Sequence, residues 1–399
     1  MPELPAFPFP DGHALRPAPQ LDEVRGGRAP VRVRLPYGDP AWLVTRYEDA
    51  RHVLSSPAFA RDPRRAGIAE EDISRTTPVD ITIQTMVSTD PPDHTRLRRF
   101  VYRAFTPRRV ERLRPGTERI AHRLVDAMVE HGPPADLFEA FGLALPIEVI
   151  CDLLGVPAAD RSRFTAWTDT LIETGGRSPE EVMAAIAEMN EYLGEQADRR
   201  AGDATDDLIG ALVRARVEDD GLSRDEMVNL VRTLLAAGHE TTASQIPNFV
   251  YLLLRGGDYK KLRDHPELVP TAVEELLRYV PLIIQGSFPR FVLEDTEVGG
   301  VGLHRGEQVL IELSAANRDG SVFPDPETLE LARADNPHLA FGFGLHRCVG
   351  ATLARMELQV ALSTLTTRLP DLRLVLPADQ IPWNTERIVR RPRELLVTW

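Results

Sequence analysis

The sequence predicts a mostly α-helical fold with a small β portion, and three observations support this. Helical periodicity runs from His94 to about Cys151 and returns over Asp225–Leu254. Residues 290–313 change to short apolar runs between glycine turns, which is typical of strands. The strands are not interleaved with helices as βαβ units, and this argues against a Rossmann or TIM architecture.

The N-terminal part, about residues 30–45, is predicted to be β-rich. Arg32–Leu35 and Ala41–Val44 are short extended runs on either side of Tyr37-Gly-Asp-Pro40, which predicts a hairpin. Tyr47–Leu54 is then expected to form a short helix. The stretch Ala58–Asp93 is irregular and contains several prolines, so we predict a long loop, and loops of this length are usually functional or disordered.

A long helical part is predicted for residues 94–279, with breaks at Pro107, Pro115 and residues 132–134. Ser223 followed by Glu226 forms a capping box, which marks the start of one helix. Glycines 175 and 176 separate two further helices and suggest a hinge. The expected helices after the break at 132–134 are Arg161–Thr174, Pro179–Arg200, Asp225–Leu254 and Pro270–Tyr279.

The C-terminal third is predicted to contain strands, one helix and a β-rich tail. Within residues 290–313 the expected strands are Phe291–Leu293, Glu297–Val301 and Gln308–Leu313. Gly350–Arg368 is expected to be the last helix, and residues 372–399 are expected to form short strands.

Composition excludes several classes of protein. Sixty acidic and 47 basic residues give the 399-residue chain a net charge of −13, which argues against nucleic acid or an anionic membrane as a partner. The two cysteines, Cys151 and Cys348, exclude a disulfide scaffold and fit a reducing compartment. We find no signal peptide and no apolar stretch that could span a membrane, so we expect a cytoplasmic protein.

The most informative segment is Phe341-Gly-Phe-Gly-Leu-His-Arg-Cys-Val-Gly350, directly before the last helix. A helix start lowers the pKa of a nearby cysteine and favours the thiolate, which is the form that binds metal. The glycines let the backbone approach a flat ligand closely. Taken alone, Cys348 could equally be a small apolar residue. Zinc is disfavoured, because only His346 lies at a usual ligand spacing.

Phe341, Gly344, His346, Cys348 and Gly350 together resemble the haem-binding signature of the cytochromes P450. The resemblance implies the cytochrome P450 fold and haem b as the cofactor, with Cys348 as the axial ligand of the iron and His346 as a propionate contact. Phe341 and Gly350 would also line the cofactor. The resemblance covers nearly the whole chain, so we expect residues 1–399 to form a single haem-centred domain.

Two further motifs resemble that family. Glu275-Leu-Leu-Arg278 matches its ExxR motif, although such a pair alone is common on helix surfaces. Ala237-Gly-His-Glu-Thr241 resembles the oxygen-binding motif, in which many members have Asp where this chain has Glu240. The resemblance implies that Glu240 and Thr241 are catalytic and supply the protons that O–O cleavage requires. The alternative is that Thr241 only bonds back to the carbonyl of Ala237.

Three basic side chains match the family's remaining propionate contacts. His94 and Arg98 lie one helical turn apart in Asp90-Pro-Pro-Asp-His-Thr-Arg-Leu-Arg-Arg99, and Arg290 occupies the third position. Bonds between cationic side chains and carboxylates are strong, and a dianionic cofactor edge needs them. Without the cysteine loop, each arginine would be taken for a solvated surface charge.

The resemblance also implies a substrate pocket that is roomy and apolar, with few polar anchors. The matching residues are Val87, Leu171, Thr233, Ala236, Ile283, Ile284 and Ile388. The similarity is greatest to soluble bacterial members that tailor macrolides and other polyketides. We therefore predict a monooxygenase that hydroxylates or epoxidises an apolar metabolite with O2. Desaturation or oxidative coupling is an alternative, as is a non-catalytic haem-binding protein, although Glu240 and Thr241 argue against the last.

Residues 96–114 carry a dense basic run with Glu111 as its only acidic residue. It could be a solvated face, and as a nucleic-acid patch it lacks any binding motif. The family resemblance implies a docking surface for an acidic ferredoxin, with a ferredoxin reductase passing on electrons from NAD(P)H. A monomer is expected. The arginines of the run are Arg96, Arg98, Arg99, Arg103, Arg108, Arg109, Arg112 and Arg114.

Overall fold

In the computed structural model the chain forms two compact units, each built from two separate stretches of sequence. The first unit comprises Met1–Thr95 and Glu274–Cys348, and the second comprises Arg96–Val273 and Val349–Trp399. That the two form one domain stays a prediction. The structure describes residues 3–10, 12, 14–27, 29–36, 38–75, 85–102, 105–172, 178–201, 205, 207–218, 221–283, 286, 288–384 and 389–399.

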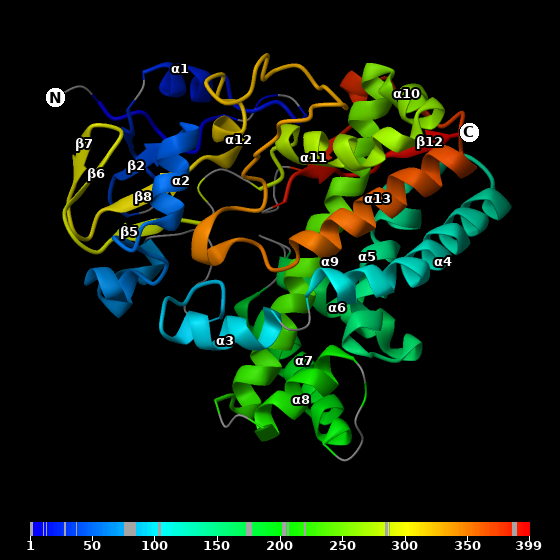
Figure 1. Cartoon of the computed structure of the whole chain (residues 1–399), viewed down its shortest axis with the longest axis horizontal. Coiled ribbons are helices and arrows are strands. Elements are labelled where there is room, and N and C mark those ends of the chain that lie inside the picture. The colour runs from blue at the N-terminus through cyan, green and yellow to red at the C-terminus, as the bar shows by residue number, and fades with distance from the viewer. Residues whose placement is uncertain are drawn as a thin grey trace. The chain divides into compact units, whose positions relative to one another are not determined.

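A five-stranded sheet forms the framework of the first unit (Figure 1). Its order is β1-β2-β8-β5-β3, with β2 and β8 parallel and the other neighbours antiparallel. The predicted hairpin is confirmed, because Val31 pairs with Leu43 and Val33 with Ala41. The strands are β1 (Val31–Val33), β2 (Ala41–Val44), β3 (Phe59–Ala60), β5 (Arg290–Val292) and β8 (Gln308–Ile311).

The described part of the first unit also contains three α-helices that lie wholly within it and a separate hairpin. The helices are α1 (Gln20–Gly26), α2 (Tyr47–Ser55) and α12 (Leu313–Ala316), and their apolar side chains join those of the sheet in two buried clusters. The prediction of one strand over Glu297–Val301 was wrong. Two glycines with φ of +57° and +82° turn the chain there, and the flanking residues form the hairpin β6 (Thr296–Val298) and β7 (Val301–Leu303).

The long loop predicted for residues 58–93 is only partly correct. Phe59 and Ala60 are buried and form the edge strand β3, because they pair with β5 far along the chain. Two short 3₁₀ helices follow, η1 (Pro63–Ala66) and η2 (Glu70–Arg75). Residues 76–84 lie outside the described part of the chain. Long-range pairing of this kind leaves no periodic signal in two residues of sequence.

The second unit is mainly helical, and α13 lies alongside α4 (Figure 1). α9 packs against α5, α6, α7, α10 and α13, so it occupies the centre of the unit. The boundary between the two units falls within two helices, α3 (Asp93–Tyr102) and α11 (Val269–Tyr279). The remaining helices are α4 (Pro107–His131), α5 (Ala144–Leu154), α6 (Arg161–Ile172), α7 (Pro179–Arg200), α8 (Leu208–Glu218), α9 (Arg224–Gly256), α10 (Asp258–Asp264) and α13 (Ala351–Arg368).

Helix boundaries follow the sequence closely except at one proline. Ser223 and Glu226 make the predicted capping box at the start of α9, and Pro107 is the first residue of α4. The break predicted at Pro115 is wrong, because α4 continues through it. The apolar face of α4 is buried beyond that point, at Ile120 and Leu124, and this tertiary packing outweighs the local penalty of the proline.

The C-terminal tail forms short strands, as predicted. One small sheet has the order β4-β12-β9, and a second consists of β10 and β11. A π-helix over Phe138–Gly142 precedes α5 and packs against α9. The strands are β4 (Ala135–Asp136), β9 (Arg373–Leu374), β10 (Trp383–Asn384), β11 (Arg391–Pro392) and β12 (Leu396–Thr398).

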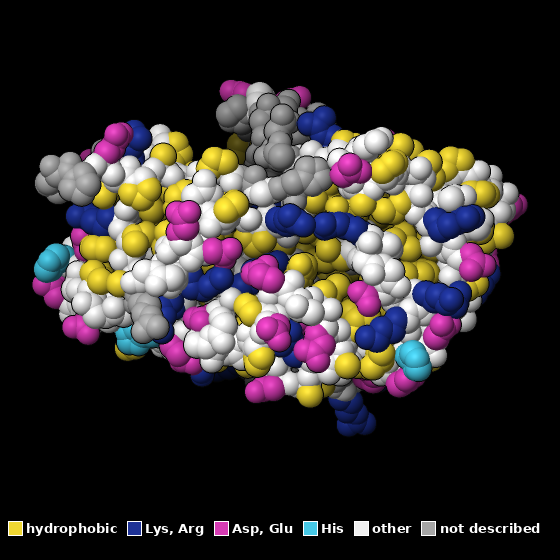
Figure 2. All heavy atoms as spheres, turned by 90° about the horizontal axis from the view of Figure 1, so that it is seen from above, with side chains coloured by type: hydrophobic (Ala, Val, Ile, Leu, Met, Phe, Trp, Pro, Cys, Tyr) yellow, Lys and Arg dark blue, Asp and Glu magenta, His cyan; other side chains and the backbone are white. Residues whose placement is uncertain are grey.

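Within the described ranges, none of the helices is both long and apolar enough to cross a membrane. Figure 2 shows acidic and basic side chains interspersed over one face, without a large region of a single sign. The net charge of −13 is therefore not gathered on that face.

Candidate functional site

The cysteine loop is a tightly turned segment of the first unit. Gly342 and Gly344 have φ of +68° and +69°, values that residues with a side chain rarely adopt. A Cβ atom on Gly344 would collide with the carbonyl oxygen of Leu54 in α2. The Cys348 backbone N–H donates to the Phe341 carbonyl at 2.8 Å, which closes the loop and leaves the cysteine exposed.

Two of the predicted propionate contacts, His94 and His346, lie together in the first unit. Their ring centroids are 4.3 Å apart, and the His94 side chain is almost completely buried. The Nε2 atom of His346 lies 3.8 Å from the Asp90 carboxylate. Burial lowers the pKa of His346, although the nearby carboxylate of Asp90 opposes this. Asp90 itself was not recognised as a site residue in the sequence.

Arg290 is buried on β5 in the same unit, together with a second arginine that the sequence did not single out. Burial lowers the pKa of Arg290 well below its usual value, and the nearby positive charge of Arg61 lowers it further. Arg61 is equally buried, and burial lowers its pKa to about 10. Asp90 offsets one of these two buried positive charges, so a net positive charge remains for an anionic ligand. This is the kind of cradle that a dianionic cofactor edge would fill.

The ExxR pair is the centre of a buried network. Arg278 donates through Nε and Nη2 to the two carboxylate oxygens of Glu275, each at 2.8 Å, and both side chains are fully buried. Glu275 also accepts hydrogen bonds from Arg333 Nε, Asn336 Nδ2 and the backbone N–H of Glu330. The alternative of an ordinary surface pair is therefore wrong for Glu275 and Arg278.

In the second unit, Glu240 and Thr241 lie on the unbroken helix α9. The hydroxyl of Thr241 donates to the Ala237 carbonyl at 2.8 Å, the back-bond expected from the sequence. Glu240 is buried, and its Oε1 atom lies 3.7 Å from Arg391 Nε. The guanidinium carbon of Arg391 lies 3.6 Å from the centre of the Phe138 ring in the π-helix. No motif in the sequence indicates Arg391, which is 151 positions from Glu240.

His239 and Gly238 show how closely this part of α9 is packed. The His239 side chain is fully buried against the backbone of Leu143, and burial lowers its pKa to about 4. His239 is therefore neutral at physiological pH. A Cβ atom on Gly238 would lie 3.4 Å from Ile150 of α5, an ordinary contact, so this glycine is not required for space on that side.

The predicted pocket residues are distributed over both units. Val87 and Ile283 belong to the first unit, and Thr233 and Ala236 lie one turn apart on α9 in the second. The Thr233 hydroxyl bonds back to the Asn229 carbonyl at 2.7 Å. The side chain of Leu171 lies outside the described part of the chain, as do Ile284, Ile388 and the predicted hinge at residues 175–176.

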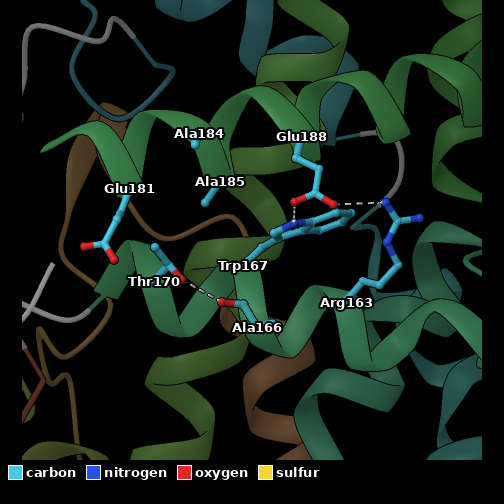
Figure 3. Close-up of a pocket in the computed structure, with 8 residues that line it drawn as sticks. All are labelled: Arg163, Ala166, Trp167, Thr170, Glu181, Ala184, Ala185 and Glu188. Atoms are coloured by element: carbon cyan, nitrogen blue, oxygen red, sulfur yellow. Dashed lines mark hydrogen bonds and ion pairs between the residues drawn. The ribbon is translucent and has the colours of Figure 1, made fainter. Parts of the chain in front are cut away.

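A pocket of about 440 Å³ lies between α6 and α7 (Figure 3). The indole N–H of Trp167 donates to Glu188 at 3.0 Å, and Arg163 lies 3.4 Å from the same carboxylate. These contacts join α6 to α7, the two helices that flank the predicted hinge. The residues that line the pocket are Arg163, Ala166, Trp167, Thr170, Glu181, Ala184, Ala185 and Glu188, and none is a predicted pocket residue.

The basic run of residues 96–114 is not uniform. Arg96 contacts Glu226 and the Gly221 carbonyl at the start of α9, and Arg114 pairs with Glu111 and contacts Gln359. Arg98 lies one turn after His94 on α3. Arg103 lies outside the described residues. The exposed arginines of the run are Arg99, Arg108 and Arg112.

The family model "Cytochrome P450" matches residues 158–399, which is more than half of the chain. The chain belongs to the cytochrome P450 family. It is accordingly a monooxygenase that uses haem b and O2, with electrons from NAD(P)H delivered through partner proteins. Soluble bacterial cytochromes P450 typically receive these electrons from a ferredoxin and its reductase.

Relatives of this cytochrome P450 cover nearly its whole length. It is 49% identical to the nocardicin C N-oxygenase of Nocardia uniformis subsp. tsuyamanensis, and 47% identical to the mycinamicin IV hydroxylase/epoxidase of Micromonospora griseorubida. Each alignment covers 99% of this chain and 98% of the relative. Among solved structures it is similar to the LnmA hydroxylase from the leinamycin pathway of Streptomyces atroolivaceus S-140, with a TM-score of 0.92 and 44% identity over 99% of this chain and 100% of that one.

The residues of the first unit fit the haem that the family implies. Cys348 is exposed on a loop that Gly342 and Gly344 turn tightly through their positive φ angles. Arg290 and His94 are buried, and the ring of His94 lies 4.3 Å from that of His346, so these side chains can serve the carboxylate edge of the cofactor. The donor set is therefore one soft sulfur ligand together with cationic contacts for two carboxylates.

Proposed function

We propose that this cytochrome P450 hydroxylates or epoxidises a macrolide or another polyketide in antibiotic biosynthesis. One atom of O2 enters the substrate, and the other leaves as water after the uptake of two electrons and two protons. The observation that carries the proposal is 47% identity over 99% of the chain with a mycinamicin IV hydroxylase/epoxidase. A second candidate is oxygenation at nitrogen, favoured by the 49% identity with a nocardicin C N-oxygenase.

We further propose that both units together form a single haem-centred domain, residues 1–399. Cys348 would be the axial thiolate ligand, with Phe341 and Gly350 beside the cofactor. Bound there, the haem would supply O2 binding and one-electron redox chemistry, favoured by the electron-rich thiolate. His94, Arg98, Arg290 and His346 would hold the propionates. The burial of Arg290 supports this role, because a buried guanidinium requires an anion.

Glu240 and Thr241 would move the protons. Thr241 presents its hydroxyl on the helix surface at the Ala237 carbonyl, and Glu240 is the adjacent buried carboxyl group. Arg391 Nε lies 3.7 Å from Glu240 Oε1 and places a positive charge beside this carboxyl group. The pocket around the substrate would consist of Val87, Leu171, Thr233, Ala236, Ile283, Ile284 and Ile388.

The partner proteins would be a ferredoxin and a ferredoxin reductase, with the enzyme as a monomer in the cytoplasm. Arg99, Arg108 and Arg112 are exposed and offer positive charge to an acidic carrier. No disulfide joins Cys151 and Cys348, which fits a reducing compartment.

The spectrum of the reduced carbon monoxide complex tests the haem-thiolate assignment. We expect the strongly red-shifted Soret band of thiolate ligation in the wild type and its loss in Cys348→Ala. A wild type without that band, or a variant that keeps it, would contradict the role of Cys348.

A substrate panel tests the reaction. Macrolides, linear polyketides and nocardicin C are added, and the spin-state shift and the oxidised products are measured. Hydroxylated or epoxidised macrolide is expected. Products oxidised only at nitrogen would favour the second candidate and overturn the first.

Charge reversal tests the docking surface. Arg108→Glu with Arg112→Glu should slow reduction by a ferredoxin at low salt, and the difference from wild type should shrink as salt rises. Arg199→Glu on α7 serves as the control, because Arg199 is exposed outside the basic run. If the double variant and the control are reduced equally fast, the docking surface lies elsewhere.

A further inference from the structure

The buried basic cluster of the first unit contains two charged residues that the proposed function does not use, Arg61 and Asp90. Arg61 is 6% exposed, and the Asp90 side chain is also 6% exposed. Arg290, a proposed propionate contact, is 5% exposed. Charged side chains buried to this extent are costly and need a compensating arrangement.

Asp90 connects three segments of the first unit. Its carboxylate accepts hydrogen bonds from the backbone N–H of Arg61, at 3.0 and 2.9 Å to its two oxygens, and from that of Asp62 at 2.9 Å. It also lies 3.8 Å from His346 Nε2 in the cysteine loop. Its main-chain carbonyl accepts from the N–H of His94 at 3.0 Å. One residue therefore fixes the segments that carry Arg61, His94 and His346.

The side chain of Arg61 is held just as firmly. Its Nε donates to the Val87 carbonyl at 3.1 Å, and its Nη1 donates to the Pro289 carbonyl at 2.9 Å. The guanidinium carbon lies 5.2 Å from the centre of the Phe288 ring. Pro289 directly precedes Arg290, so the same side chain fixes the backbone beside a proposed propionate contact. Neither charge can move without breaking several hydrogen bonds.

The charges of the cluster influence one another. Burial raises the pKa of Asp90, but nearby His346 and hydrogen bonds from the backbone of Asp62 and Arg61 outweigh this, and the pKa is lowered. Asp90 is thus ionised at neutral pH. The pKa of Arg290 is lowered by burial and by Arg61, and Asp90 opposes both effects. Asp90 therefore offsets a positive charge that Arg61 adds.

We propose that Arg61 and Asp90 are positioning residues whose fixed, opposite charges set how readily the cofactor held by this cluster accepts its first electron. The inference rests on the proposed placement of the propionates beside Arg290 and His346. A buried positive charge favours the reduced form of the cofactor, because reduction adds one negative charge, and a buried negative charge disfavours it. The electron comes from the partner protein, and no covalent bond is made or broken in this step.

Midpoint potentials of the haem-loaded enzyme test the proposal. In Asp90→Asn the amide oxygen can still accept the backbone hydrogen bonds, so the charge is removed with little change of shape. We expect the equilibrium constant for one-electron reduction to rise about tenfold, a positive shift of about 59 mV. Arg61→Gln should shift it in the opposite direction by a similar factor. The double variant should return close to the wild type.

Asp93→Asn is the matched control, because this exposed aspartate on α3 undergoes the same change of charge. Asp90→Glu keeps the charge and should leave the potential near that of the wild type. Shifts of equal sign in Asp90→Asn and Arg61→Gln, or a shift in Asp93→Asn as large as in Asp90→Asn, would overturn the proposal. The reduced carbon monoxide spectrum separates this from failure of the proposed function: if the wild type lacks the thiolate band, the haem assignment itself fails.

Discussion

Glu275 offers the sharpest test of what holds the first unit together, because its carboxylate is completely buried and accepts five hydrogen bonds. Two come from Arg278 at 2.8 Å, and the others come from Arg333, Asn336 and the backbone of Glu330 at 3.0 to 3.1 Å. Glu275→Gln keeps the size of the side chain but leaves two buried guanidinium groups without their anion. Removing one partner of a buried ion pair costs about 3–5 kcal/mol.

The magnitude is checked by urea unfolding of the haem-loaded protein, followed by circular dichroism and by the absorbance of the haem. Glu195→Gln is the control, because it removes the carboxylate of an exposed pair in which Arg199 and Glu195 lie 3.5 Å apart with 69% and 56% of their side chains exposed. An exposed pair is worth at most about 1 kcal/mol. We therefore expect the Glu275 variant to lose several times more unfolding free energy than the control.

The result that would refute this reasoning is equal destabilisation of the two variants. A loss below about 1 kcal/mol for Glu275→Gln would mean that the amide satisfies Arg278 and Arg333 as well as the carboxylate does, so that charge is unimportant in the network. Arg333→Gln gives an independent measurement, since Arg333 donates to Glu275 at 3.1 Å and to the Pro324 carbonyl at 2.9 Å.

Four further predictions follow from other parts of the structure. Thr241→Ala removes a hydroxyl proton donor on α9, so less product and more hydrogen peroxide should form per NAD(P)H consumed. An unchanged ratio of product to NAD(P)H would contradict the role of Thr241 in proton supply. Gly344→Ala places a Cβ atom against α2 at a residue with a φ of +69°, so we expect poor haem incorporation. The ratio of Soret absorbance to protein absorbance measures this. Normal incorporation would show that the loop adapts to the side chain. His239 has a pKa of about 4 in the folded chain and 6.5 in the unfolded chain, so the unfolded state binds more protons between these two pH values. About 3 kcal/mol of unfolding free energy is therefore lost as the pH falls from 6.5 to 4. His239→Gln should flatten this part of the profile of stability against pH, and a profile identical to that of the wild type would refute the prediction. Ser223→Ala removes the N-cap of α9 and should lower the free energy of unfolding in urea by about 1 kcal/mol. An unchanged free energy of unfolding would show that water replaces the hydroxyl fully.

Much of the helical framework was predictable because its signals are local. The capping box at Ser223, the proline at the start of α4 and the glycine turns of residues 290–313 each fix a boundary within a few residues. Pro115 misled the prediction because a proline penalty is local, whereas the burial that overrides it depends on α5 and α13 packing against α4. The edge strand β3 was missed for the same reason, since its partner β5 lies more than 200 residues away.

The residues of the candidate site are likewise of two kinds, those in local motifs and those whose contacts exist only in the folded chain. Cys348, His346, Glu240 and Thr241 stand in short motifs that resemble those of the family, so they could be proposed from the sequence. Arg391 was not found, because its relation to Glu240 exists only after β11 has been placed against α9. No spacing rule connects residues 240 and 391.

Arg61 and Asp90 show why such residues escape a search for motifs. Asp90 immediately precedes two prolines and looks like an ordinary turn residue, and Arg61 looks like a surface cation. Their importance comes from burial, because a charge at 6% exposure acts on its neighbours through a medium of low dielectric constant. The motif residues would hold the cofactor, while the charges behind them would adjust its chemistry. Related enzymes could therefore differ in their reduction potential while keeping every motif residue unchanged.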